Sequence, residues 1–127
     1  MKPETIAALC DISASRLKSD GRAVLRAFRA SGYMDCPNEV TEAAIEAHLR
    51  SHPELVEQWF LYSLDQRSTP SWYLEEPGSG KGSGPHWRVG YLDDRRTSEV
   101  TFADGFQACA YFVKRMAEQW AGSARSV

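Results

Sequence analysis

The clearest pattern in the sequence lies in residues 72–103, WYLEEPGSGKGSGPHWRVGYLDDRRTSEVTFA. It contains three short segments in which apolar and polar residues alternate: WYLEE (72–76), HWRVGYL (86–92) and SEVTFA (98–103). Alternation with period two, in segments rich in aromatic and β-branched residues, is typical of half-buried β-strands. Three such segments separated by turns predict an antiparallel meander.

The alternation divides these residues between the two faces of the predicted sheet. One face is apolar and is expected to meet the core; it consists of Trp72, Leu74, Trp87, Val89, Tyr91, Val100 and Phe102. The other face is mixed and is expected to point outward; it consists of Tyr73, Glu75, His86, Arg88, Gly90, Glu99 and Thr101.

A helix is predicted directly after the third strand. Asp104 is a good N-cap, and Gln107 occupies the capping-box position three residues later. Apolar residues then recur at helical spacing, at Phe106, Cys109, Ala110, Val113, Met116 and Trp120. We expect this face to cover the sheet, and residues 121–127 to form a flexible tail.

The first half of the chain has helical periodicity. An apolar face over residues 15–31 predicts a helix that Gly32 ends; the face consists of Leu17, Val24, Leu25 and Phe28. Thr41 is expected to cap a second helix, whose apolar face is Ala44, Ile45 and Leu49. A shorter helix is expected within residues 3–10.

A further helix is predicted over residues 53–67. Residues 51–54, Ser-His-Pro-Glu, fit a capping box with proline in the first turn. The apolar stripe of this helix is Leu55, Val56, Trp59, Phe60 and Ser63. The elements together predict an α+β protein in a single domain, with a helical part (1–67) and a β-β-β-α part (68–120).

Composition limits the class of protein. The chain has 127 residues, 43% of them hydrophobic, and a net charge of -2, which is unlike a protein that coats nucleic acid. Its cysteines, Cys10, Cys36 and Cys109, are odd in number and far apart, so we expect free thiols in a reducing compartment. We expect neither a signal peptide nor a membrane span, and therefore a cytoplasmic protein.

The glycine-rich segment EPGSGKGSGP (76–85) superficially suggests a phosphate-binding loop. A P-loop requires G-x-x-x-x-G-K-[ST] between a strand and a helix, so that the helix N-terminus faces the phosphate. Here Gly82 follows Lys81 where serine or threonine is required, Glu75 occupies the first glycine position, and the segment joins two strands. We therefore interpret it as a hairpin loop.

The candidate catalytic residues have simpler structural explanations. His48 and His52 are four residues apart, but Leu49 replaces the glutamate of H-E-x-x-H and a helix break separates them. Cys109 lies on an apolar helix face, where cysteine is usually a small buried hydrophobe. We therefore expect no enzyme, no metal and no cofactor; a small enzyme that uses Cys109 or the histidines is a third alternative.

Charge is unevenly distributed along the helical half. Basic residues dominate residues 16–29, namely Arg16, Lys18, Arg22, Arg26 and Arg29. Acidic residues dominate residues 39–65, namely Glu39, Glu42, Glu46, Glu54, Glu57 and Asp65. The two sets can form ion pairs with each other, or the acidic set can attract a basic partner.

Residues 62–116 resemble a class of small bacterial immunity proteins, which are encoded beside polymorphic or contact-dependent (type VI or Rhs-like) toxins and protect the producer by binding the toxin domain. The resembling residues are Asp65 and Arg67, Trp72-Tyr73, the segment 87–91, and Phe102 followed by Ala108-Cys109. The resemblance implies a stoichiometric inhibitor of a cytosol-acting toxin effector domain, with no activity or cofactor of its own.

Two surfaces are candidates for binding such a partner. The first is the outward face of the sheet, with Tyr73, Glu75, Arg88 and Glu99. The second is the acidic helical surface, with Glu42, Glu46, Glu54 and Glu57. The alternative function is that of a nucleic-acid-associated regulator, in which the basic helix over 15–31 contacts phosphates.

Overall fold

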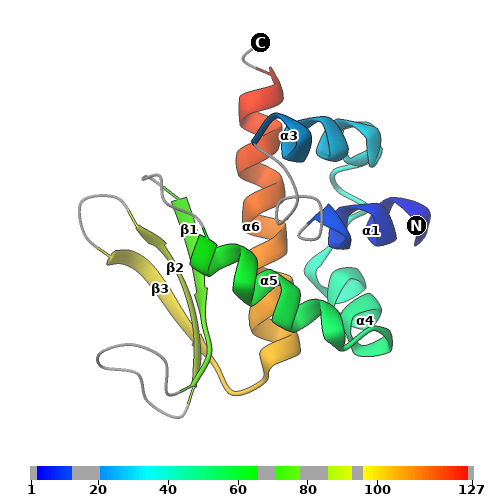
Figure 1. Ribbon diagram of the computed structural model, residues 1–127. Coiled ribbons are helices and arrows are strands. Elements are labelled where there is room, and N and C mark those ends of the chain that lie inside the picture. The colour runs from blue at the N-terminus through cyan, green and yellow to red at the C-terminus, as the bar shows by residue number, and fades with distance from the viewer. Residues whose placement is uncertain (1–2, 13–20, 66–70, 78–85, 93–95, 126–127) are drawn as a thin grey trace.

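The computed structural model describes residues 3–12, 21–65, 71–77, 86–92 and 96–125. Its elements, in chain order, are α1 (Pro3–Cys10), α3 (Gly21–Ala30), the short 3-10 helix η1 (Tyr33–Asp35), α4 (Glu42–Ser51), α5 (Glu54–Asp65), β1 (Ser71–Glu75), β2 (Trp87–Leu92), β3 (Arg96–Phe102) and α6 (Gly105–Arg125). The predicted α+β fold, with N-terminal helices followed by β-β-β-α, is confirmed (Figure 1).

The three strands form the predicted antiparallel meander, in the order β1-β2-β3. Trp72 pairs with Tyr91, and Leu74 pairs with Val89, so the apolar residues of neighbouring strands share one face. Leu74 and Val89 are fully buried. The period-two pattern therefore placed the core face of β1 and β2 correctly.

β3 contains an irregularity that the pattern does not reveal. The pairs on either side of Gly90 are Val89–Val100 and Tyr91–Thr97, so β3 has two residues where β2 has only Gly90. This arrangement is a β-bulge, which bends the edge strand and makes it a poorer template for pairing with another chain.

Helix α6 is the centre of the fold. Figure 1 shows it between the sheet and the N-terminal helices, and it contacts all three strands as well as α3, α4 and α5. Its predicted apolar face is buried at Cys109, Ala110, Val113, Met116 and Trp120. Truncating one of these buried side chains would therefore disturb the packing of α6 on the sheet and on the N-terminal helices.

Side-chain hydrogen bonds attach α5 to its neighbours. The indole Nε1 of Trp59 donates to the carbonyl oxygen of Cys10 at 3.0 Å, which joins α5 to α1. The backbone N–H of Leu74 donates to the hydroxyl of Ser63 at 2.8 Å, which joins β1 to α5. Both bonds are buried, and each satisfies a polar group that would otherwise be costly to bury.

Two predicted helix boundaries are confirmed. Thr41 is the N-cap of α4, where its hydroxyl accepts a hydrogen bond from the N–H of Ala44 at 3.2 Å. Gly32 follows the end of α3 with φ of 88°, a left-handed conformation that glycine adopts without strain. A Cβ at this position would also lie 3.1 Å from the Thr5 hydroxyl.

Two other predicted boundaries are wrong. Ser51 does not cap α5, because α4 continues through Ser51 and α5 begins at Glu54. The C-terminal helix does not end at Trp120, because α6 extends to Arg125 and buries Ala121. Residues 13–20 of the predicted basic helix and the hairpin loop 78–85 lie outside the described residues.

The three cysteines are free, as predicted, and all three are buried, which the sequence predicted only for Cys109. Across the described part of the chain, we find no helix both long and apolar enough to cross a membrane.

Candidate partner-binding surface

The outward face of the sheet brings together the four residues predicted there, but two of them are buried and Glu75 is only slightly exposed. Tyr73 and Arg88 each retain only 9% of their surface. The Tyr73 hydroxyl forms a hydrogen bond with the carboxylate of Glu99 across the sheet. Arg88 Nη2 lies 2.7 Å from Glu75 Oε1 on the neighbouring strand.

Tyr73 and Arg88 therefore lie on the outward face of the sheet, as predicted, but are largely buried there. The Arg88 and Glu75 side chains are only 11% and 15% exposed, so each compensates the charge of the other in a partly desolvated position. Cross-strand pairs of this kind stabilise a sheet. The geometry assigns these residues a structural role in holding β1, β2 and β3 together.

The predicted acidic surface divides into two parts. Glu42 lies 3.1 Å from Arg115 of α6, and Glu46 lies 2.8 Å from Arg50 of its own helix. Glu54 and Glu57 are both exposed in the first turn of α5. Both acidic residues of α4 therefore pair with an arginine, Glu42 with one of α6 and Glu46 with one of α4.

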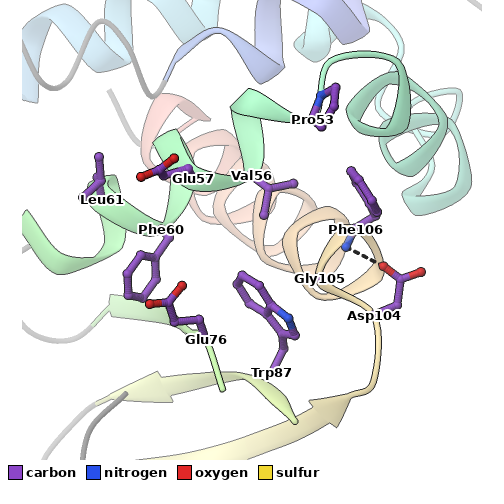
Figure 2. Close-up of a pocket in the computed structure, with 10 residues that line it drawn as sticks. All are labelled: Pro53, Val56, Glu57, Phe60, Leu61, Glu76, Trp87, Asp104, Gly105 and Phe106. Atoms are coloured by element: carbon purple, nitrogen blue, oxygen red, sulfur yellow. Dashed lines mark hydrogen bonds between the residues drawn. The ribbon is translucent and has the colours of Figure 1, made fainter. Parts of the chain in front are cut away.

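A groove lies where α5, the sheet and the beginning of α6 meet, and it has a volume of about 610 Å³ (Figure 2). Its lining residues are Pro53, Val56, Glu57, Phe60, Leu61, Glu76, Trp87, Asp104, Gly105 and Phe106. Phe60, Trp87 and Phe106 come from three different elements and are each only partly buried. Leu61 is 43% exposed, which is high for a large apolar side chain.

Trp87 forms one wall of the groove against the first residue of α6. A Cβ added at Gly105 would lie 2.8 Å from two ring atoms of Trp87. Only glycine therefore lets the indole lie against the start of the helix in this position. Trp87 packs against backbone on one side and borders the groove on the other.

Asp104 organises the other end of the groove. Its carboxylate accepts a hydrogen bond from the N–H of Phe106 at 2.8 Å, which confirms the predicted N-cap of α6. It also accepts a hydrogen bond from Arg50, whose guanidinium lies 4.8 Å from the centre of the Phe106 ring. Arg50 thus joins α4 to α6 through a carboxylate and an aromatic ring.

Opposing effects act on the pKa of Asp104. Desolvation raises the pKa, but the hydrogen bonds from Arg50 and from the N–H groups of Phe106 and Gln107 outweigh it and lower the pKa below its usual range. The carboxylate is therefore negative at neutral pH, and the guanidinium of Arg50 compensates its charge at the groove.

Sequence reasoning identified only Glu57 among the residues of this groove. The sequence pattern places Val56, Phe60, Trp87 and Phe106 on apolar faces and Asp104 at a helix cap, and it assigns Leu61 to no face. One indication was available: Leu61 is a large apolar residue outside the predicted stripe of α5. Such a residue is expected on the surface, where it can contribute to an interface.

Cys109 is buried, as its position on an apolar helix face predicts, but the predicted helix break between His48 and His52 is wrong, because α4 continues to Ser51 and His52 is its C-cap. Burial raises the pKa of Cys109 well above its ordinary value, with a smaller contribution from Cys10. The rings of His48 and His52 stack with centroids 4.4 Å apart. Within the ranges that the structure describes, no three His, Cys, Asp or Glu side chains are grouped to hold a metal ion.

Comparisons with protein-family models, with curated proteins and with solved structures find no match to this chain.

Proposed function

We propose that the protein is an immunity protein, which binds a cognate cytosol-acting toxin domain and blocks its active site or the path of its substrate. The observation that carries the proposal is the groove between α5, β2 and α6. It presents Phe60, Leu61, Trp87 and Phe106 partly exposed, beside the carboxylates of Glu57 and Glu76. Aromatic anchors bordered by charged groups are typical of the centre of a protein–protein interface.

The resemblance of residues 62–116 to small immunity proteins supports the same proposal. An inhibitor of this kind acts by surface complementarity, so what it needs is a rigid surface rather than a reactive group. The groove meets this need because its walls are fixed by the Asp104 cap, by Arg50 over Phe106 and by the close packing of Trp87 on Gly105.

The first test is the capture of the partner. The full chain, tagged and purified from the cytosol of the cells that produce it, is washed at high salt and its bound proteins are identified by mass spectrometry. We expect one stoichiometric protein whose isolated domain is toxic when expressed alone and harmless when co-expressed with this chain. Recovery of nucleic acid alone, released by salt, would instead favour the regulator that uses the basic residues of α3.

The structure offers a matched pair of variants for this test. Leu61 and Val100 are both exposed large apolar residues, at 43% and 37%, but only Leu61 lines the groove. We expect Leu61→Ala to weaken toxin binding about tenfold, a loss of ~1.4 kcal/mol, and Val100→Ala to leave it within about twofold. Equal effects of the two substitutions would remove the groove from the proposal.

A further inference from the structure

The groove is acidic as well as apolar. Three of its ten lining residues carry carboxylates, Glu57, Glu76 and Asp104, and none of the ten carries a positive charge. The carboxylates come from α5, from the end of β1 and from the start of α6, so they border the groove on several elements. A ligand that enters the groove therefore meets negative potential from more than one direction.

The apolar part of the groove suits a long side chain. Figure 2 shows Phe60 from α5 and Trp87 from β2 projecting from opposite walls into the same space, with Val56 beside them. Lysine and arginine place an aliphatic stem against apolar surface and keep their charged head at a polar edge. The rings of Trp87 and Phe60 would also attract such a cation directly.

We infer that the groove receives a basic, amphipathic segment of the partner, in which a lysine or arginine lies beside an aromatic or aliphatic side chain. This inference rests on the proposed function, because it describes the part of the toxin that the groove meets. The cationic head is held by Glu57, and Glu76 adds negative charge at the border of the groove, while the neighbouring apolar side chain packs against Leu61 and Phe60. Asp104 contributes its charge but is already bonded to Arg50 and to the α6 backbone.

Acidic residues at the groove would also attract a basic partner as it approaches the protein. The chain carries a net charge of -2, and the acidic residues of α4 are partly neutralised by Arg50 and Arg115. The exposed carboxylates Glu54 and Glu57 lie on α5, beside and within the groove. Charges at the border of an interface mainly raise the association rate, so binding is expected to weaken as salt is added.

The inference is tested with defined peptides, without the toxin. The probes are a blocked hexapeptide of alternating leucine and arginine, a twin with glutamate for each arginine, and a twin with serine for each leucine. Binding to the full chain is followed by NMR, through the indole resonance of Trp87 and the amide resonances of Gly105 and Phe106. We expect the first peptide to shift these resonances, and each twin to bind at least about fivefold more weakly.

Charge reversal provides the matched comparison within the protein. Glu54 and Glu57 are both exposed carboxylates in the first turn of α5, so reversing either one places a positive charge near the helix N-terminus, but only Glu57 lines the groove. We expect Glu57→Lys to weaken binding of the leucine–arginine peptide about tenfold, and Glu54→Lys to have a clearly smaller effect. Equal effects would assign the peptide to the general acidity of α5 and overturn the groove assignment.

Other outcomes identify a different occupant. Equal binding of the glutamate twin, or no shift at millimolar peptide, would overturn the inference. Shifts centred on Glu42 or on the outward face of the sheet would move the binding site elsewhere. Shifts of the groove resonances on raising the protein concentration alone would make a second copy of this chain the occupant.

The peptide experiment and the toxin-capture experiment can fail independently, and each failure has a different meaning. If the peptide binds in the groove but no toxic partner is captured or neutralised, the proposed function is wrong and the groove remains a site for basic segments. If a toxin is neutralised but Glu57→Lys leaves its binding unchanged, the proposed function holds and the groove assignment is wrong.

Discussion

The ring of Tyr73 lies over the α-carbon of Gly90 on the outward face of the sheet: a Cβ added at Gly90 would be 2.6 Å from Tyr73 Cζ. These two residues are direct partners in the β1–β2 register. The glycine lets the ring cross β2, so that its hydroxyl reaches Glu99 in the bulged part of β3. A single side chain thereby connects all three strands.

We predict that Gly90→Ala destabilises the protein by about 1–3 kcal/mol, because the new methyl group forces the Tyr73 ring away from β2 and from Glu99. The measurement is the free energy of unfolding in urea. In a Tyr73→Leu background the cost of Gly90→Ala should be much smaller, because the ring that it displaces is gone.

The control for this prediction is Gly122→Ala. Gly122 lies inside α6, and a Cβ there meets no atom within 4 Å. Alanine is the better helix former, so this substitution should stabilise the protein by about 0.5–1 kcal/mol. If both glycine substitutions changed stability in the same direction, the contact between Tyr73 and Gly90 would not explain the first result.

The order of elements and the core face of β1 and β2 were predictable because both depend on local patterns. The alternation of Trp72 and Leu74 with polar residues, and the spacing of Cys109, Val113 and Met116, directly reflect which side of each element is buried. The burial of Tyr73 was not predictable in this way. It depends on register, which places Tyr73 opposite a glycine, and on a bulge in another strand.

We predict that Asp104 contributes to stability in a way that is lost in acid. The pKa of its carboxyl is lowered in the folded state: desolvation opposes the shift, but the hydrogen bonds from Arg50 and the α6 backbone prevail. Because the pKa is lowered in the folded state, the stabilisation by Asp104 is fully present above the pKa of the unfolded chain, about 3.9. It is lost as the pH falls through the pKa of the folded protein.

The measurement is the pH dependence of unfolding for the wild-type protein and for Asp104→Asn. Asparagine also caps helices well, so most of the cap is retained while the charge is removed. The wild-type protein should lose stability more steeply than the variant as pH falls below about 4. Parallel curves for the two proteins would contradict a charge-dependent role of Asp104.

The thiols are predicted to be unreactive in the folded protein. Burial, with a smaller contribution from Asp11, raises the pKa of Cys10 to about 12, and burial also raises that of Cys109. Cys36 is 5% exposed. Because the thiolate is the nucleophile, Ellman's reagent at pH 8 should label all three cysteines only after unfolding in guanidinium. Rapid labelling of Cys109 in the native state would revive the alternative of a small cysteine enzyme.

The groove shows the limit of reasoning from sequence more clearly than the fold does. Its residues come from α5, from the ends of β1 and β2, and from the start of α6, so no local pattern contains them. The alternation pattern places Trp87 on the core face of β2, and its side chain does lie on that face. The pattern does not reveal that Trp87 remains partly exposed. That exposure depends on how far α5 and α6 extend over the end of the sheet, which is a property of tertiary packing.

The stacked histidines predict a second pH dependence, near neutrality. The pKa of His48 is lowered, first by desolvation and then by the neighbouring His52, while Asp11 and Glu54 oppose the shift. The unfolded chain therefore binds more protons than the folded one between the folded pKa and about 6.5. The contribution of His48 to the free energy of unfolding is therefore fully present above a pH of about 6.5 and decreases as the pH falls below that value.

His52→Gln tests this coupling, because it removes the second positive charge while His48 stays half-buried in α4. We expect an NMR titration to show a higher pKa for His48 in the variant than in the wild-type protein, and the stability of the variant to fall less between pH of about 7 and 5. The backbone N–H of His52 donates to the His48 carbonyl oxygen at 3.1 Å, a bond that glutamine retains. A His48 that titrates at its ordinary pKa in the wild-type protein would show that neither burial nor the stacked ring disfavours its charged form.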